Sequence, residues 1–239
     1  AFEPLFADGF ESGDQSAWVQ VVPPSTAALV GYWPFDSDSN DHSGNGNNGT
    51  WSGGGGLSAG RFGNAANFLP NQYYQISQST TLRTFTALTV SAWFRPTALP
   101  QDNEDLFGGG LDGGPSRYAL FLLLTPEGGA TFNLYNDSSV PGSVPNPTTA
   151  VPNYLNNWHH FAATWDGAAV QVYVDGQPTL SGTFSGPLSV PTDRPLFINR
   201  HLWGGGSGSS SRLQGAIDDL AVFGRALAAS EIAALATDG

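Results

Sequence analysis

One acidic loop contains residues that could bind a metal ion. The stretch WPFDSDSNDHSGNGNNG gathers Asp36, Asp38 and Asp41 with four asparagines and three glycines. Carboxylates, amide oxygens and the exposed carbonyls of a glycine-rich loop are the ligands that Ca²⁺ prefers. The spacing does not match the helix-loop-helix calcium loop, so a further ligand must come from elsewhere, and Asp218 in the IDDL stretch could provide it. The alternative is that these aspartates form turns and stay solvated.

Two other polar stretches contain residues that could hold a sugar. RHLWGGGSGSSSR offers His201, Trp203 and Arg212, and QDNEDLFGGGLDGG offers Asp102 among further acidic and amide side chains. Sugars are bound by aromatic rings stacked on their apolar faces and by planar polar groups that hydrogen-bond their hydroxyls, on loops of a rigid scaffold. The alternatives are that Trp203 covers an edge of the core and that the DNED cluster is a solvated loop.

Residue patterns for common enzymatic chemistry are absent from the sequence. The five glutamates are not spaced as the alternating carboxylates that glucanases place on one strand to flank a glycosidic bond. Thiol catalysis is excluded without cysteine, and no Gly-x-Ser-x-Gly motif connects a strand to a helix. The GGGG run lacks the lysine of a phosphate-binding loop. A lyase or hydrolase with an unfamiliar site around Tyr118, His160 and Arg95 is the catalytic alternative that stays open.

Charge and composition restrict the partners and the compartment. All eight basic residues are arginines and the net charge is -12, so nucleic acid and acidic membrane surfaces are repelled at long range. No apolar run approaches the roughly 20 residues of a membrane helix. The acidic composition, rich in Gly, Ser, Asn and Thr and lacking Cys and Met, favours a secreted protein.

The elements that must position these residues are short strands. Segments rich in β-branched or aromatic residues and bounded by Gly, Asn, Asp or Pro are typical of strands. They are ALVGYWPFD, FGNAANFL, YYQIS, LTVSAWFRP, YALFLLLT, TFNLYN, HHFAATW, VQVYVDG, LFINR and GAIDDLAVF. This pattern predicts an all-β sandwich of two sheets, with one short helix in ALAASEIAALA. Residues 1–26 are predicted to be an extension with a Pro linker, and residues 27–239 one domain.

The stretch WHHFAATWDGAAVQVYVDG predicts a core hairpin. Side chains alternate along a strand, so His159 shares a face with Phe161 while His160 faces the other way. The two histidines therefore cannot converge on one metal ion or one substrate atom. The two Asp-Gly pairs predict tight turns, because glycine tolerates positive φ.

Several of these stretches together resemble a known family. The hairpin, ALVGYWPFD followed by DHSGNGNNGTW, LTVSAWFRP and GAIDDLAVFGRALAASEIAAL resemble laminin G-like and pentraxin-like domains of the concanavalin A-like lectin/glucanase superfamily. The resemblance implies a jelly-roll sandwich of two curved antiparallel sheets. It also implies a structural calcium between the opening segment and the last strand, held by Asp36, Asp41 and Asp218, with Asn45 as a further ligand.

The sequence thus predicts a secreted, non-catalytic laminin G-like domain, stabilised by calcium, that binds carbohydrate or another extracellular polymer. The predicted ligand-binding residues are Trp203, His201, Arg212 and Asp102. The alternative is an adhesive or structural module that binds a protein, either by itself or as an appendage of a larger extracellular protein. The long Pro-rich loop at 136–157 would favour that alternative if its apolar residues formed a surface patch.

Overall fold

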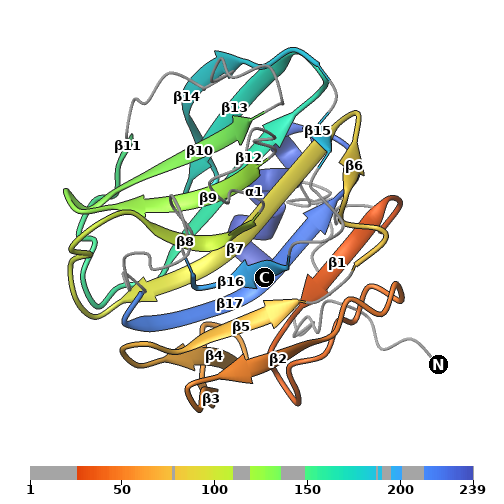
Figure 1. Ribbon diagram of the computed structural model, residues 1–239. Coiled ribbons are helices and arrows are strands. Elements are labelled where there is room, and N and C mark those ends of the chain that lie inside the picture. The colour runs from red at the N-terminus through yellow and green to blue at the C-terminus, as the bar shows by residue number, and fades with distance from the viewer. Residues whose placement is uncertain are drawn as a thin grey trace, which may run out of the picture.

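The computed structural model describes most of the chain between Thr26 and Asp238 (Figure 1). The described residues are 26–76, 79–109, 119–135, 149–186, 188–189, 195–200 and 213–238. Except for Thr26, the predicted extension therefore lies outside the described residues.

The strands pair into two antiparallel sheets that face each other (Figure 1). One sheet has eight strands in the order β14-β13-β12-β7-β17-β4-β3, with β1 beside β17. Its strands are β1 (Leu29–Trp33), β3 (Gly56–Ala59), β4 (Asn64–Phe68), β7 (Leu88–Pro96), β12 (His159–Trp165), β13 (Ala169–Val174), β14 (Gln177–Thr183) and β17 (Gly215–Phe223). The predicted all-β sandwich is confirmed.

The second sheet has seven strands in the order β11-β10-β9-β8-β16-β5-β2. Its strands are β2 (Gly49–Ser52), β5 (Tyr73–Ile76), β8 (Glu104–Gly109), β9 (Ala119–Thr125), β10 (Gly129–Tyr135), β11 (Thr149–Ala150) and β16 (Leu196–Ile198). A short third pair joins β6 (Thr84–Phe85) to β15 (Leu188–Ser189).

Apolar side chains from both sheets fill the space between them. On β12, Phe161, Ala163 and Trp165 belong to this core and are at most 1% exposed. His159 points to the same side, where its ring lies 5.9 Å from that of Phe94, and His160 points away. The predicted alternation along this strand is confirmed, so burial of one face determines which residues it turns outward.

Both Asp-Gly turns of the predicted hairpin are present. Asp175 and Gly176 have φ angles of 49° and 73° between β13 and β14, which is the left-handed pair that a tight two-residue hairpin requires. In the other turn, the carboxylate of Asp166 accepts hydrogen bonds from the backbone N–H groups of Ala168 and Ala169. The turn residues thus determine the register of three neighbouring strands.

The predicted C-terminal helix is α1 (Ala229–Asp238), and it covers part of the outer face of the eight-stranded sheet (Figure 1). Ile232, with Leu227 just before the helix, packs in a small second core with Tyr173 and Phe223. At the start of the helix the Glu231 carboxylate accepts a hydrogen bond from the Ala228 N–H and pairs with Arg225. Glu231 therefore caps a helix start that lacks a Ser or Thr.

One predicted solvated loop is instead a strand. Glu104 and Asp105, in the DNED cluster, begin β8 and are 5% and 1% exposed. Pairing with β9 and β16 encloses this strand, and adjacent positions on it face opposite sides of the sheet. The expectation of solvation is therefore wrong for these two carboxylates.

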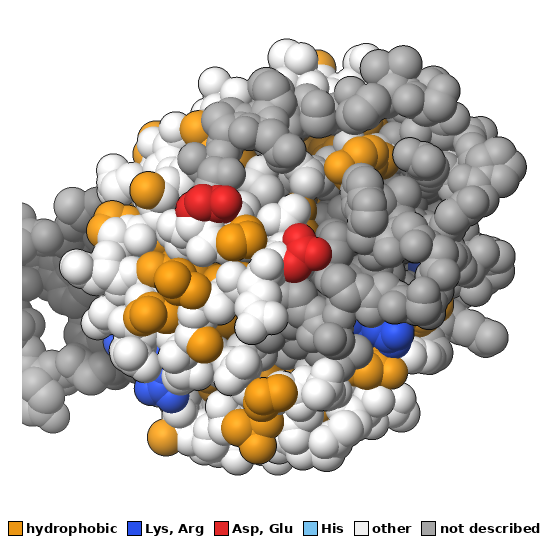
Figure 2. Space-filling view, turned by 60° about the vertical axis from the view of Figure 1, so that its left-hand side comes forward, with side chains coloured by type: hydrophobic (Ala, Val, Ile, Leu, Met, Phe, Trp, Pro, Cys, Tyr) orange, Lys and Arg blue, Asp and Glu red, His pale blue; other side chains and the backbone are white. Residues whose placement is uncertain are grey.

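The described surface is mostly uncharged and polar in the view of Figure 2, with apolar side chains in small separate groups. Large apolar side chains that are exposed are Leu57, Leu69, Leu99 and Leu155. In the described part of the chain, no helix combines the length and the apolar character needed to span a membrane.

Candidate functional site

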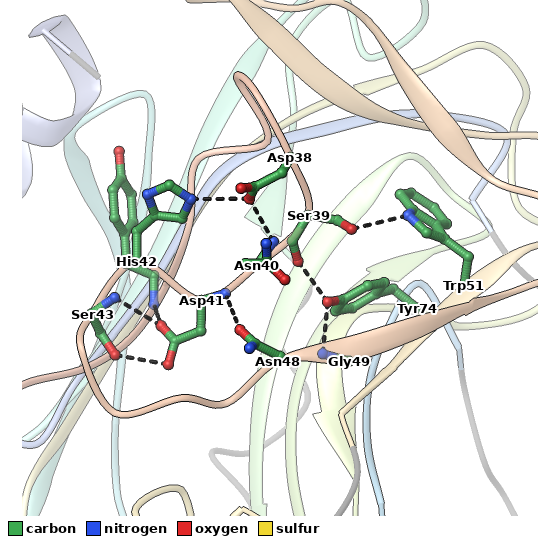
Figure 3. A network of polar contacts seen from close by, with 11 residues as sticks. Asp38, Ser39, Asn40, Asp41, His42, Ser43, Asn48, Gly49, Trp51 and Tyr74 are labelled. Carbon is green, nitrogen blue, oxygen red and sulfur yellow. Dashed lines mark hydrogen bonds and ion pairs between the residues drawn. The ribbon is translucent and has the colours of Figure 1, made fainter.

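The acidic loop between β1 and β2 is organised by Asp41 (Figure 3). Its carboxylate accepts hydrogen bonds from the backbone N–H groups of Tyr32, Ser43 and Asn47 and from the Ser43 hydroxyl, at 2.8–2.9 Å. Asn45 donates to the Leu29 carbonyl and to Ser43. Asp41 and Asn45 thus close the loop onto β1 through protein groups.

The rest of this loop forms a second set of contacts around an aromatic pair (Figure 3). Asp38 pairs with His42 at 3.0 Å and accepts a hydrogen bond from the Asn40 N–H. Ser39 accepts a hydrogen bond through its hydroxyl from the Trp51 indole and through its carbonyl from the Tyr74 hydroxyl. The loop is therefore fastened to the sheet edge by β2 and β5.

We expect Asp41→Ala to lower the free energy of unfolding by about 2 kcal/mol, because several backbone donors lose their acceptor together. Asp38→Ala is the matched control, since Asp38 is exposed on the same loop and its loss should cost less than about 0.5 kcal/mol. Urea unfolding of both proteins measures the difference. Equal losses would contradict the role of Asp41.

Asp36 and Asp218 meet at a different place, the turn between β3 and β4. The Asp218 carboxylate accepts hydrogen bonds from the Arg61 and Phe62 N–H groups, and the Asp36 carboxylate accepts one from the Asn64 N–H. Gly60 and Gly63 have no room for a side chain there, since a Cβ would lie 2.5 Å and 1.9 Å from these two carboxylates. Both acids therefore pin the turn to the start and the end of the domain.

Burial gives this junction unusual proton affinities. It raises the pKa of Asp218 to about 8, with a smaller contribution from the charge of Asp219. Burial also raises the pKa of Asp219 to about 6, although a 2.7 Å hydrogen bond from the Tyr32 hydroxyl opposes the shift. A β-bulge between Asp218 and Ala221 places the two carboxyl groups side by side.

The four predicted calcium ligands thus bond to different segments: Asp41 and Asn45 hold the loop between β1 and β2, and Asp36 and Asp218 hold the turn between β3 and β4. Within the residues described, no group of three or more His, Asp or Glu side chains could hold a metal ion. The side chains present do not form a complete calcium site by themselves. Calcium binding stays a prediction, and it concerns the Asp36 and Asp218 junction.

A second candidate site is the outer face of the seven-stranded sheet, which we call the polar face. Strand alternation and pairing put the following side chains on it: Tyr73, Gln75, Asp105, Thr125, Thr131, Asn133, Phe197 and Arg200. Neighbouring strands lie about 4.8 Å apart, so the face from β5 to β10 is wide enough for several sugar rings.

The deep part of the polar face carries polar atoms that have no hydrogen-bond partner within the described residues. The Thr125 and Thr131 hydroxyls and the Asn133 side-chain carbonyl are such atoms, in residues that are 3–7% exposed. Buried polar groups are nearly always paired, because an unpaired one costs about 1–3 kcal/mol. Asp105, which is 1% exposed, lies between these residues and β16. The polar face thus offers unmet hydrogen-bonding capacity within a few strands.

The rim of the polar face is aromatic. The Arg200 guanidinium lies 4.4 Å from the centre of the Tyr73 ring and 4.7 Å from that of Phe197, and the two rings meet edge to face at 5.7 Å. The Arg200 Nε has no hydrogen-bond partner. Tyr73 and Arg200 are half-buried, so exposure falls from this rim toward Asn133.

Asn199 fixes the two ends of the segment that contains most of the predicted sugar-binding residues. Its amide exchanges two hydrogen bonds with the backbone of Leu213 and donates a third to the Gln72 carbonyl. His201, Trp203 and Arg212 belong to this segment and lie outside the described residues. The segment begins directly after Arg200, at the rim of the polar face.

The other predicted residues do not converge. Asp102 is exposed before β8, where it accepts a hydrogen bond from the Asn103 N–H. Tyr118 lies outside the described residues. His160 and Arg95 lie on the eight-stranded sheet, where His160 is 1% exposed and bonded to the Ser91 hydroxyl. Sequence reasoning missed Thr131 and Asn133, although their alternation with Phe132 in TFNLYN was a usable signal.

Comparison with known proteins matches residues 68–233 to the laminin G family model described as the concanavalin A-like lectin/glucanases superfamily. The chain belongs to this superfamily. The resemblance and the jelly-roll architecture predicted from the sequence are therefore confirmed. No curated protein matches the chain.

Solved structures share this lectin/glucanase fold. Domain 4 of AbnA, a GH43 extracellular arabinanase from Geobacillus stearothermophilus, solved with arabinotriose, has a TM-score of 0.68 and 23% identity over 88% of this chain and 99% of that one. The botulinum neurotoxin serotype G binding domain has a TM-score of 0.64 and 14% identity over 87% of this chain and 50% of that one. A Trypanosoma rangeli sialidase mutant has a TM-score of 0.58 and 21% identity over 88% of this chain and 33% of that one.

Proposed function

We propose that this domain is a non-catalytic carbohydrate-binding module that holds a neutral oligosaccharide on the polar face. The observation that carries the proposal is the set of buried, unpartnered polar atoms of Thr125, Thr131 and Asn133 beside an aromatic rim. The arabinotriose complex of AbnA domain 4, which shares the fold, supports a sugar as the ligand.

The polar face suits a sugar because its buried polar atoms can bind sugar hydroxyl groups and its aromatic rim can pack on the apolar face of a sugar ring. Hydroxyl groups can both donate and accept, so they pair with Thr131, Asn133 and the Asp105 carboxylate. The apolar face of a sugar ring packs on an aromatic ring, and Tyr73 is half-buried at the rim. A rigid sheet holds these groups in place before the ligand arrives, which reduces the entropy that binding costs.

Two observations support a binding function without catalysis. Glycosidases use two carboxyl groups that flank the bond to be cleaved, about 5–9.5 Å apart. The described strand residues of the polar face supply one carboxylate, Asp105, and the adjacent Glu104 faces the other side of the sheet. The His160 and Ser91 pair lies on the other sheet, outside the polar face, and within the described residues no carboxylate bonds the His160 Nδ1 to orient it as a base.

The same proposal includes an extracellular location, supported by the acidic composition and by the extracellular arabinanase that shares the fold. Binding of a protein partner is the alternative prediction. In the view of Figure 2 the exposed apolar side chains occur in separate small groups, so the face drawn there does not favour it.

We expect the wild-type protein to bind arabinotriose or another neutral oligosaccharide of a glycan array, and Thr131→Val with Asn133→Leu to weaken that binding about tenfold or more. The same pair of substitutions should leave the melting temperature equal or higher, because it removes the Thr131 hydroxyl and the Asn133 side-chain carbonyl, which have no partner in the described part of the protein. Calorimetric titration and a thermal melt measure both effects.

Asn40→Ala is the control, since Asn40 is exposed in the loop before β2 and lies outside the polar face. The control should bind like the wild type. Unchanged sugar affinity in the Thr131 and Asn133 double variant would overturn the proposed site, and absence of binding to every glycan of the array would overturn the function.

A further inference from the structure

The outer face of the eight-stranded sheet carries arginines stacked on aromatic rings. The Arg61 guanidinium lies 4.9 Å from the ring centres of both Phe62 and Trp93, and the Arg95 guanidinium lies 5.0 Å from that of Trp158. Trp93 and Arg95 are two positions apart on β7, so both point to this face, about 7 Å apart along the strand. We call Arg61, Phe62, Trp93, Arg95 and Trp158 the arginine face.

The side chains of the arginine face differ in exposure, and Trp93 is 5% exposed. The Trp93 indole donates a hydrogen bond to the Leu235 carbonyl, so the last turns of α1 border the arginine face. Arg61 is exposed, and Arg95 and Trp158 are half-buried. Arg95 pairs with Ala216 on β17, and Ala216 pairs with Asn67 on β4. The half-buried amide side chain of Asn67 therefore lies on the same face as Arg95.

The two guanidinium groups of the arginine face have no acceptor in the described part of the protein, whereas other arginines do. Arg225 forms a two-point ion pair with Glu231, and Arg83 donates to the Ser79 carbonyl. Arg61 and Arg95 make only ring contacts through their guanidinium groups. The Asp218 carboxylate is 1% exposed and accepts hydrogen bonds from the Arg61 and Phe62 backbone N–H groups, not from a guanidinium group.

This chemistry selects one kind of ligand. A guanidinium group that lies flat on an aromatic ring keeps its N–H edge free to bind a carboxylate at two points. A partly exposed indole beside it can pack on the apolar face of a sugar ring and donate a hydrogen bond to a hydroxyl. The net charge of -12 repels polyanions at long range, but salt screens this repulsion beyond roughly 8–10 Å, so the arginines can bind a carboxylate at close range.

We infer that the arginine face is a second binding surface, separate from the polar face, that recognises the carboxylate of a uronic acid residue in an acidic polysaccharide. The two surfaces lie on opposite sheets, so one domain can bind two sugar chains, or two parts of one chain, at the same time. This inference does not depend on a ligand at the polar face.

The test is affinity electrophoresis in gels that contain polygalacturonate or its methyl ester. We expect the wild-type protein to be retarded by polygalacturonate and not by the ester, and Arg61→Gln with Arg95→Gln to weaken the binding about tenfold. Arg61→Lys with Arg95→Lys keeps the charge and should recover part of the affinity, because an ammonium group cannot bind a carboxylate at two points.

A control protein separates local recognition from overall charge. Ser181→Asp with Thr183→Asp makes the net charge more negative by the same amount, at exposed positions on the edge strand β14, and should bind polygalacturonate much more tightly than the glutamine variant. Equal binding by the wild type and the glutamine variant would overturn the inference. Equal retardation by polyglutamate would overturn the sugar assignment and point to an acidic protein segment. Neutral-sugar binding that survives in the glutamine variant shows that the polar face is a separate site.

Discussion

Asp218→Asn is expected to make the folded protein more stable than the wild type at pH 8 in the absence of metal ions, and to change its stability little near pH 4. Asp218 is 1% exposed, and burial raises its pKa to about 8, with Asp219 adding to the shift. An amide keeps the shape and the acceptor oxygen for the Arg61 N–H but carries no charge.

The direction in which the free energy of unfolding changes with pH follows from proton linkage. In the unfolded chain the Asp218 carboxyl group loses its proton near pH 4, whereas in the folded protein it keeps the proton until pH 8. The folded state therefore binds more protons between these values, and the free energy of unfolding of the wild type falls as pH rises through this window. The loss is on the order of 5 kcal/mol, at about 1.4 kcal/mol per pKa unit.

Urea unfolding at several pH values from 4 to 8, with a chelator present, measures the effect. The wild-type curve should fall toward pH 8, and the Asp218→Asn curve should be flatter. Parallel curves for the two proteins would contradict the buried, protonated carboxyl group. Asp41→Asn is a useful comparison, because Asp41 bonds within the loop between β1 and β2 and its replacement should leave the pH dependence of Asp218 in place.

The same pair of proteins tests calcium binding at the Asp36 and Asp218 junction. If calcium binds there, millimolar calcium should raise the melting temperature of the wild type most at pH 8, where the carboxyl group ionises most readily, and should not affect Asp218→Asn. Equal melting temperatures of the wild type in calcium and in chelator would rule out the predicted structural calcium.

His160→Leu is expected to gain stability relative to the wild type as pH falls from 6.5 to 4, because the variant lacks the destabilising contribution of His160 in this window. Complete burial lowers the pKa of His160 to about 4, although the charge of Asp175 opposes the shift. Its Nε2 contacts the Ser91 hydroxyl at 2.8 Å, and its Nδ1 has no partner in the described structure. A protonated imidazolium there would be a buried charge without a counter-ion.

The unfolded chain binds a proton at His160 below about pH 6.5, and the folded protein binds it only near pH 4, so stability is lost as pH falls through this window. The loss amounts to about 3 kcal/mol. Leucine has no proton to bind, and the variant should lose about 1–2 kcal/mol at neutral pH through the broken contact with Ser91.

His159→Leu is the matched control, because the pKa of His159 is shifted in the opposite direction to that of His160. Burial by itself would lower the pKa of His159. Its 3.0 Å hydrogen bond to Asp175 and the charge of that carboxylate outweigh burial, so the pKa of His159 lies above the ordinary value. Its contribution to stability is therefore present below pH 6.5 and is lost as pH rises through the folded pKa. Thermal melts from pH 4 to 8 compare the two variants. A difference in stability between His160→Leu and the wild type that does not change from pH 6.5 to pH 4 would contradict the assignment.

The hairpin shows why so much of the fold could be predicted from the sequence. Its alternating residues and Asp-Gly turns are local signals, and burial of Phe161, Ala163 and Trp165 then determines where His160 points. The ten segments predicted as strands all contain strands in the structure, because aromatic and β-branched residues favour a half-buried pleated surface. Strand β8 was not predicted, because its first two residues are charged. Local composition does not show that this strand pairs with β9 on one side and β16 on the other.

By itself, the sequence determined the class of architecture, the family, the turns and the exclusion of familiar catalytic motifs, because those depend on local pattern and on residue types. Only the tertiary structure decided which polar residues share a surface. Asp36 and Asp41 are close in sequence but bond to different partners, whereas Thr131, Asp105 and Arg200 are far apart in sequence and lie on one face. The physical reason is that antiparallel pairing between distant strands determines which side chains become neighbours, and the spacing within one segment carries no information about that pairing.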